Sequence, residues 1–158
     1  MDILTDVALL SRIQFALTVA YHFIFVPLSI GLGLITAIFA TKYYRSRDEK
    51  DGAAVRLWVK IFTATFAIGV ATGITMEFSF GTNWADYSRF VGDIFGAPLA
   101  AEALFAFFLE SVFLGVLLFG RNKVSPKFYT VSAWLVWAGS LLSALWILIA
   151  NSWMQTPA

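Results

Sequence analysis

The sequence predicts an all-α membrane protein with four transmembrane helices. Of its 158 residues, 59% are hydrophobic and 13% are charged, whereas a soluble domain carries about 25% charged residues. The apolar residues are also gathered in long runs, as membrane-spanning helices require. This composition excludes a water-soluble enzyme. The net charge of +1, without a basic face, argues against a partner made of nucleic acid.

Four apolar runs are the predicted spans, and they cover residues 13–41, 58–80, 98–120 and 128–149. The first run would extend about 43 Å as a helix, which exceeds a bilayer core of about 30 Å. The second contains Gly69 and Gly73, a pair of small residues that lets another helix or a flat cofactor approach closely. The third begins at Pro98, a residue suited to the first turn of a helix. The fourth contains Gly139 and Ser143 as a second small pair.

Basic residues lie mainly in two of the three connections between the spans. The connection after the first span, together with Lys60 at the start of the second span, carries six Lys or Arg residues, and the connection after the third carries three. The predicted loop at 81–97 contributes only Arg89, and the segment before the first span only Arg12. Because basic loops stay on the cytoplasmic side, we expect both termini on the outer face.

The absence of cysteine and the single histidine limit any cofactor chemistry. Without cysteine the chain forms no disulfide, holds no cysteine-ligated iron–sulfur cluster and attaches no c-type haem covalently. With one histidine it cannot supply two imidazole ligands to one haem iron. It offers one imidazole, that of His22.

Four ionisable side chains lie within the predicted spans: those of His22, Glu77, Glu102 and Glu110. A charge near the bilayer centre costs about 2.5–3.5 kcal/mol, so each needs a partner, water, an ion or protonation. In the expected orientation the first three lie at one level near the outer face. On a regular helix Glu110 would lie about 12 Å deeper than Glu102 and be rotated from it by roughly 80°.

This layout is the one expected when a buried reaction draws protons from the cytoplasm. Glu110 and Ser111, with Ser140 and Ser143, could form a polar strip towards the inside. The residues leave two other hypotheses open. One is a proton- or cation-coupled transport bundle without haem, because carboxylates within the membrane also bind ions. The other is a non-catalytic bundle that stabilises a partner subunit.

Four stretches of the sequence resemble subunit I of the cytochrome bd-type quinol oxidases. They cover residues 11–28, with YHFIFVPL at their end; 66–84, with GVATGITMEF; 91–111, with GAPLAAE; and 143–157, with SALWILIANSWMQTP. The resemblance covers nearly the whole chain. It implies a membrane enzyme that oxidises quinol and reduces dioxygen to water by means of haems b558, b595 and d.

The resemblance also implies roles for individual residues. His22 matches the axial ligand of one of the two high-spin haems, b595 or d. Glu102 matches a carboxylate beside the di-haem site that takes part in haem binding and proton delivery, and Glu77 matches a further acidic residue near these haems. Glu110 matches the deeper carboxylate of the proton pathway from the cytoplasm, with Ser143 on the same route.

Residues 1–158 resemble a single transmembrane bundle, the N-terminal four-helix portion of a larger haem-binding subunit. The ligands of haem b558 and the quinol-binding loop lie in the part of the family's subunits that has no counterpart in this sequence. The implied partners are a second large membrane subunit, small single-helix subunits and the lipid bilayer. The implied location is the bacterial cytoplasmic (inner) membrane.

Overall fold

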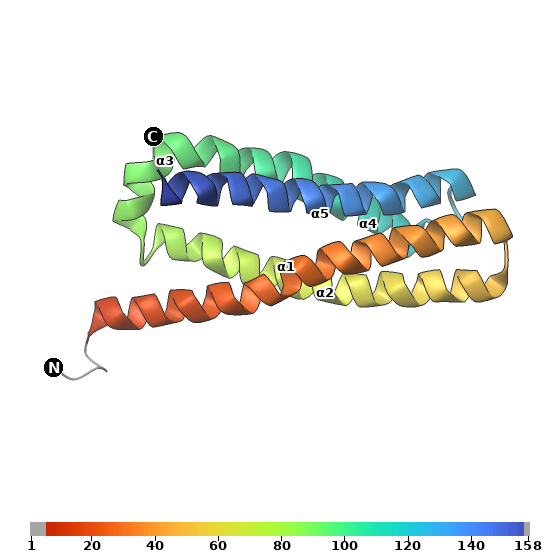
Figure 1. The fold of residues 1–158 in the computed structure, drawn as a ribbon, viewed down its shortest axis with the longest axis horizontal. Coiled ribbons are helices and arrows are strands. Elements are labelled where there is room, and N and C mark those ends of the chain that lie inside the picture. Colours follow the sequence, from red (N-terminus) through yellow and green to blue (C-terminus); the bar gives the residue numbers. More distant parts are fainter. Residues whose placement is uncertain (1–5, 157–158) are drawn as a thin grey trace.

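The computed structural model describes residues 6–156, which form helices joined by short turns. In chain order the elements are α1 (Val7–Ser46), α2 (Glu49–Gly81), α3 (Ala85–Ala101), the π-helix η2 (Glu102–Phe107), α4 (Phe108–Phe119) and α5 (Pro126–Gln155). α3, η2 and α4 follow one another without a break. The beginning of α3 crosses the end of the bundle, and the chain then turns and runs back beside α5 as the third of four long rods (Figure 1). Each rod is long and apolar enough to cross a membrane. The prediction of an all-α fold with four such helices is confirmed.

The third rod begins earlier than the sequence analysis predicted. Pro98 was expected in the first turn of a helix that follows a loop at 81–97, but α3 already begins at Ala85 and Pro98 lies inside it. Only residues 82–84 form the turn between α2 and α3. An internal proline removes one backbone hydrogen bond, and helices within membranes tolerate this loss better than helices in water. The prediction that residues 81–97 form a non-helical loop is therefore wrong, although the beginning of α3 crosses the end of the bundle and so connects the second rod to the third (Figure 1).

The helices also extend beyond the apolar runs because polar residues cap them. Asp6 accepts a hydrogen bond from the backbone N–H of Leu9 at 3.0 Å, which begins α1 six residues before the predicted span. The Asp48 carboxylate caps α2, and the Ser125 hydroxyl caps α5. Such caps satisfy backbone N–H groups that have no partner within the helix.

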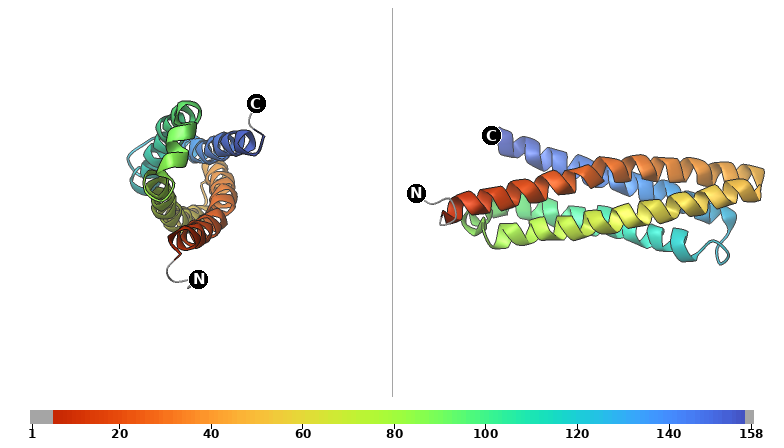
Figure 2. Two further views of the ribbon diagram at one scale, coloured as in Figure 1. Left: turned by 90° about the vertical axis from the view of Figure 1, so that its left-hand side faces the viewer. Right: turned by 90° about the horizontal axis from the view of Figure 1, so that it is seen from below.

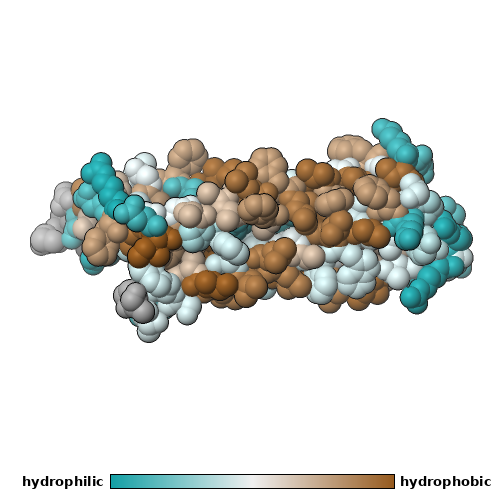
Figure 3. Space-filling view, turned by 90° about the horizontal axis from the view of Figure 1, so that it is seen from above, coloured by the Kyte–Doolittle hydropathy of each residue, from teal (hydrophilic) through white to brown (hydrophobic). Residues whose placement is uncertain are grey.

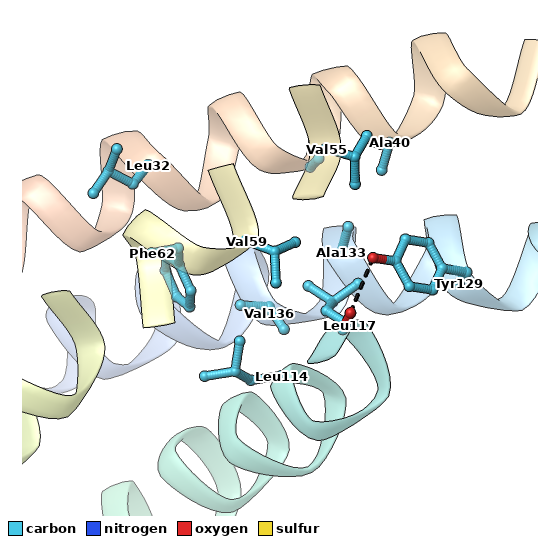
Figure 4. Packing of buried hydrophobic residues seen from close by; sticks show 11 residues of the cluster. Leu32, Ala40, Val55, Val59, Phe62, Leu114, Leu117, Tyr129, Ala133 and Val136 are labelled. Carbon is cyan, nitrogen blue, oxygen red and sulfur yellow. Dashed lines mark hydrogen bonds between the residues drawn. The ribbon is translucent and has the colours of Figure 1, made fainter. Parts of the chain in front are cut away.

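Each rod packs on its neighbours in chain order, and α1 also packs on α5 (Figure 2). The main core cluster lies in the half of the bundle nearer the α1–α2 turn, and Figure 4 shows how its side chains pack. Its members are Leu32, Ala37, Ala40, Val55, Val59, Phe62, Leu114, Leu117, Tyr129, Ala133 and Val136. The other half, which carries His22 and Glu102, contributes none of these residues.

Large apolar side chains are exposed on every rod, as they are in a protein surrounded by lipid. Figure 3 shows hydrophobic residues along the middle of the bundle and hydrophilic residues towards its two ends. Examples of the exposed side chains are Phe23, Phe78, Phe90, Phe119 and Leu148. A contiguous apolar surface of this kind marks contact with a membrane or a partner rather than with water.

Ionic and polar contacts tie the turns together at the end of the bundle that carries most of the basic residues. Arg121 donates to the Gly52 carbonyl at 2.8 Å, and its guanidinium lies 4.8 Å from the centre of the Tyr43 ring. Lys42 forms an ion pair of 2.7 Å with Asp51. At the opposite end α1 begins and α5 ends (Figure 1). That this opposite end faces the outside remains a prediction.

Candidate functional site

The His22 side chain of α1 contacts a polar and a small residue of α2. Its Nδ1 lies 2.9 Å from the Thr72 hydroxyl oxygen. This oxygen is in turn 2.9 Å from the carbonyl oxygens of Ile68 and Gly69. A Cβ atom added at Gly73 would lie 3.2 Å from Cε1 of the imidazole. The predicted small-residue pair is thus a place of close approach, and at Gly73 the group that approaches is the histidine ring.

The other ring nitrogen of His22, Nε2, is available to bind a ligand. Within residues 6–156 no hydrogen bond engages Nε2, and the residue is partly exposed. These residues contain no cluster of three His, Cys, Asp or Glu side chains that could hold a bare metal ion. A haem iron is held by its porphyrin and needs only an axial ligand from the protein. A single imidazole with Nδ1 engaged and Nε2 open therefore fits a haem.

Glu110 is buried against α5, with 6% of its surface exposed. The Ser140 hydroxyl donates to its carboxyl group at 2.5 Å. The two helices approach closely here because Gly139 has no side chain: a Cβ at this position would lie 3.2 Å from Cβ of Glu110. Buried carboxyl groups need such partners, because an unpaired polar group in an apolar medium is costly.

Glu102 is the first residue of η2, and the Ser143 hydroxyl donates to its carboxyl group at 2.5 Å. The resemblance placed Ser143 on the route of Glu110, whereas here Ser143 contacts Glu102 and Ser140 contacts Glu110. The Ser111 hydroxyl is buried and makes no hydrogen bond within the described chain. Within the expected polar strip the structure thus shows two carboxyl–serine pairs, and Ser111 belongs to neither of them.

The π-helix η2 changes the expected relation between Glu102 and Glu110. A π-helical turn accommodates one extra residue, so these eight residues turn about as far as seven residues of an α-helix. Their rotation is then roughly 20° instead of roughly 80°. Both carboxyl groups accordingly bond to one face of α5, at Ser140 and Ser143, which are about one turn apart. No residue pattern identifies a π-helix, so the sequence analysis missed this alignment.

Glu77 is exposed and makes no hydrogen bond or ion pair to another described residue. It lies on α2, about one turn beyond Gly73 and hence towards the end where α2 meets α3. The structure therefore joins Glu102 and Glu110 to serines, and His22 to Thr72, but leaves Glu77 outside these contacts. Sequence reasoning missed Thr72, although its place directly before Gly73 could have indicated it.

Comparisons with known proteins agree on one family. The family model described as cytochrome bd terminal oxidase subunit I matches residues 10–158. Cytochrome bd-II ubiquinol oxidase subunit 1 of Escherichia coli K12 is 57% identical over 152 residues, which are 96% of this chain and 30% of the relative. Cytochrome bd ubiquinol oxidase subunit 1 of Bacillus subtilis is 51% identical over 148 residues, which are 94% and 32% of the two chains.

A solved structure has the same fold. The bd oxidase from Geobacillus thermodenitrificans superimposes with a TM-score of 0.86 at 32% sequence identity, over 96% of this chain and 35% of the solved one. The chain thus spans about a third of the length of the relatives it matches. The family match, the sequence identities and the shared fold together show that this chain belongs to the cytochrome bd terminal oxidase subunit I family.

Proposed function

We propose that this chain forms part of a terminal respiratory oxidase of the bacterial inner membrane. The enzyme oxidises quinol and reduces dioxygen to water at a di-haem site, with protons taken from the cytoplasm. The observation that carries this proposal is the pair of carboxyl–serine contacts in a chain of this family: a buried one between Glu110 and Ser140 and a half-buried one between Glu102 and Ser143. Family membership favours this function over a transport bundle without haem.

His22 is the proposed axial ligand of one high-spin haem, b595 or d. The support is its open Nε2, since an imidazole nitrogen that no described residue engages would hold the iron of a haem. The bound haem would supply the iron that takes up dioxygen and passes electrons to it. Glu102 and Glu77 are proposed to lie beside this site. The ligands of haem b558 belong to the larger subunit outside this chain.

Glu110 is the proposed entry carboxyl group for protons from the basic end of the bundle. From Glu110 a proton reaches Glu102 by way of the Ser140 and Ser143 hydroxyl groups, each of which can donate one hydrogen bond and accept another. The two pairs lie on one face of α5, about one turn apart. A water molecule or a rotation of a glutamate side chain completes the step between them.

The proposed partners follow from the same family. They are a second large membrane subunit and small single-helix subunits, with quinol and dioxygen as substrates. The apolar side chains exposed on every rod are available for contact with these subunits and with lipid. Since the chain spans about a third of its relatives, the reaction requires the rest of the larger subunit.

The proton route is tested by Glu110→Gln in the full-length subunit, purified with its partner subunits. The substitution keeps a hydrogen-bonding group of the same shape but removes the titrating site. We expect quinol oxidation to slow at least tenfold while the haem spectrum is retained. Asp86→Asn is the matched control, because the Asp86 side chain is fully exposed. Wild-type turnover in Glu110→Gln would refute the route.

The haem assignment is tested separately by His22→Ala in the same complex. We expect the visible spectrum to lose the signal of one high-spin haem and to keep the signal of the low-spin haem. An unchanged spectrum would refute His22 as an axial ligand. A wild-type complex without visible absorption would instead support the transport hypothesis.

A further inference from the structure

The contact between His22 and Thr72, taken with the bonds of Thr72 to its own helix, indicates which nitrogen of the imidazole carries the proton. The Thr72 hydroxyl has a single proton, and its oxygen lies 2.9 Å from two carbonyl oxygens of its own helix, those of Ile68 and Gly69. Threonine in a helix commonly donates to such a carbonyl. The oxygen then presents a lone pair to Nδ1 of His22, at 2.9 Å. The proton of the neutral imidazole accordingly lies on Nδ1.

This tautomer is the one that an axial ligand requires. A neutral imidazole has one N–H group and one nitrogen with a free lone pair. With the proton on Nδ1, the lone pair lies on Nε2, which no described residue engages. Partners of the second nitrogen orient a ligating histidine and raise its basicity. Thr72 is such a partner, because its hydroxyl oxygen contacts Nδ1, the second nitrogen of His22.

Gly73, the residue after Thr72, limits how the imidazole ring of His22 can turn. A Cβ at Gly73 would lie 3.2 Å from Cε1 of His22 and 3.9 Å from Nε2. The ring edge therefore borders the space that a side chain at position 73 would fill, while Thr72 engages Nδ1. Two consecutive residues of α2 thus restrain a side chain that is attached to α1.

We propose that Thr72 is a positioning residue for the haem ligand: its hydroxyl oxygen accepts the Nδ1–H of His22 and so fixes the tautomer, orientation and basicity of the imidazole. This inference rests on the proposed role of His22 as an axial ligand. It adds a residue that acts on the haem only through His22. Its removal should change the properties of the haem iron without removing the ligand.

The test uses Thr72→Val in the full-length subunit with its partner subunits. Valine has the shape of threonine but cannot accept the Nδ1–H bond. The iron–histidine stretching band of the reduced high-spin haem is measured by resonance Raman spectroscopy, and the midpoint potential of the same haem by redox titration. We expect the band to move to lower frequency and the potential to rise, because the imidazole becomes a weaker donor.

Two variants provide the controls. Thr72→Ser keeps the hydroxyl and is expected to restore the wild-type band and potential. Thr75→Val removes a hydroxyl from the same helix that bonds only to its own backbone, at the Ala71 carbonyl, and is expected to leave both values unchanged. If Thr72→Val does not assemble, Thr72→Ala makes the same prediction without placing a methyl group against the ring.

The outcomes separate this inference from the function on which it rests. A wild-type band and potential in Thr72→Val or Thr72→Ala, together with haem loss in His22→Ala, would overturn the role of Thr72 alone. Retention of every haem signal in His22→Ala would overturn the proposed ligand and the role of Thr72 with it. A shift in Thr72→Val that also occurs in Thr75→Val would show a general effect on α2 and would likewise overturn the inference.

Discussion

Replacing Gly139 by alanine tests how closely α4 and α5 must approach for the carboxyl–serine pairs to form. The added Cβ would lie 3.1 Å from Cδ2 of Leu109, 3.2 Å from Cβ of Glu110 and 3.4 Å from the Ala106 carbonyl oxygen. Leu109 can rotate away, but Cβ of Glu110 moves only with its backbone. The helices must therefore separate by a few tenths of an ångström.

A separation of a few tenths of an ångström is expected to lower the stability of the protein but to leave the hydrogen bond between Ser140 and Glu110 in place. Overpacking costs about 1–3 kcal/mol, and the better helix propensity of alanine offsets about 0.5–1 kcal/mol. The difference between these ranges is a net loss of about 0–2.5 kcal/mol in the free energy of unfolding, and we expect a value near the middle, about 1 kcal/mol. The Ser140–Glu110 bond starts at 2.5 Å, so lengthening by a few tenths leaves it within the range of O–H···O bonds. Turnover should fall less than in Glu110→Gln.

Unfolding of the purified full-length complex in denaturing detergent, followed by circular dichroism, measures the stability change. Gly115→Ala is the matched control: it lies on α4, and a Cβ there would have no atom within 4 Å. Gly115→Ala therefore gains the better helix propensity of alanine but introduces no close contact with a neighbouring helix. If Gly139→Ala is as stable as Gly115→Ala, the close approach at Gly139 does not limit packing and the reasoning fails.

Two further substitutions test contacts nearer the basic end of the bundle. Gly52→Ala places a Cβ 2.5 Å from Nη2 of Arg121 and 2.9 Å from the Tyr43 ring. The substitution should therefore displace the guanidinium and destabilise the protein by about 1–2 kcal/mol. An unchanged melting temperature would contradict this expectation. Tyr129→Phe removes a buried bond of 3.0 Å to the Leu117 carbonyl near the end of α4, at a cost of about 1–3 kcal/mol. Thermal melting in detergent measures this loss, and a variant as stable as the wild type would refute it.

Pro98 shows where sequence reasoning about the fold failed. Proline is common in the first turn of a helix, so the third span was predicted to begin there. Asp86, Arg89 and Asp93, which precede it, were assigned to the predicted loop at 81–97. In the structure they belong to α3, which starts at Ala85. Local preferences could not show this, because the packing of α3 against α2 and α5 contributes to whether the helix continues through the proline.

The candidate site was predicted in its residues but not in its pairing. The carboxyl groups of Glu102 and Glu110 stood out because charge is costly within a membrane. Their partners did not stand out, since serine is common wherever helices pack closely. Which serine meets which carboxyl group depends on the register between α4 and α5, and the extra residue in η2 sets that register.

The amino-acid sequence alone determined that this protein consists of long apolar helices, because the balance of apolar and charged residues along the chain decides which segments lipid accepts. It also determined which ionisable side chains lie within those helices, where a charge costs free energy because lipid solvates it poorly. Only the tertiary structure decided that His22 meets Thr72 and Gly73, and that Ser140 and Ser143 each meet one carboxyl group. Hydrogen bonds act over about 3 Å, and helices that are distant in sequence reach that range only when their packing sets both rotation and register.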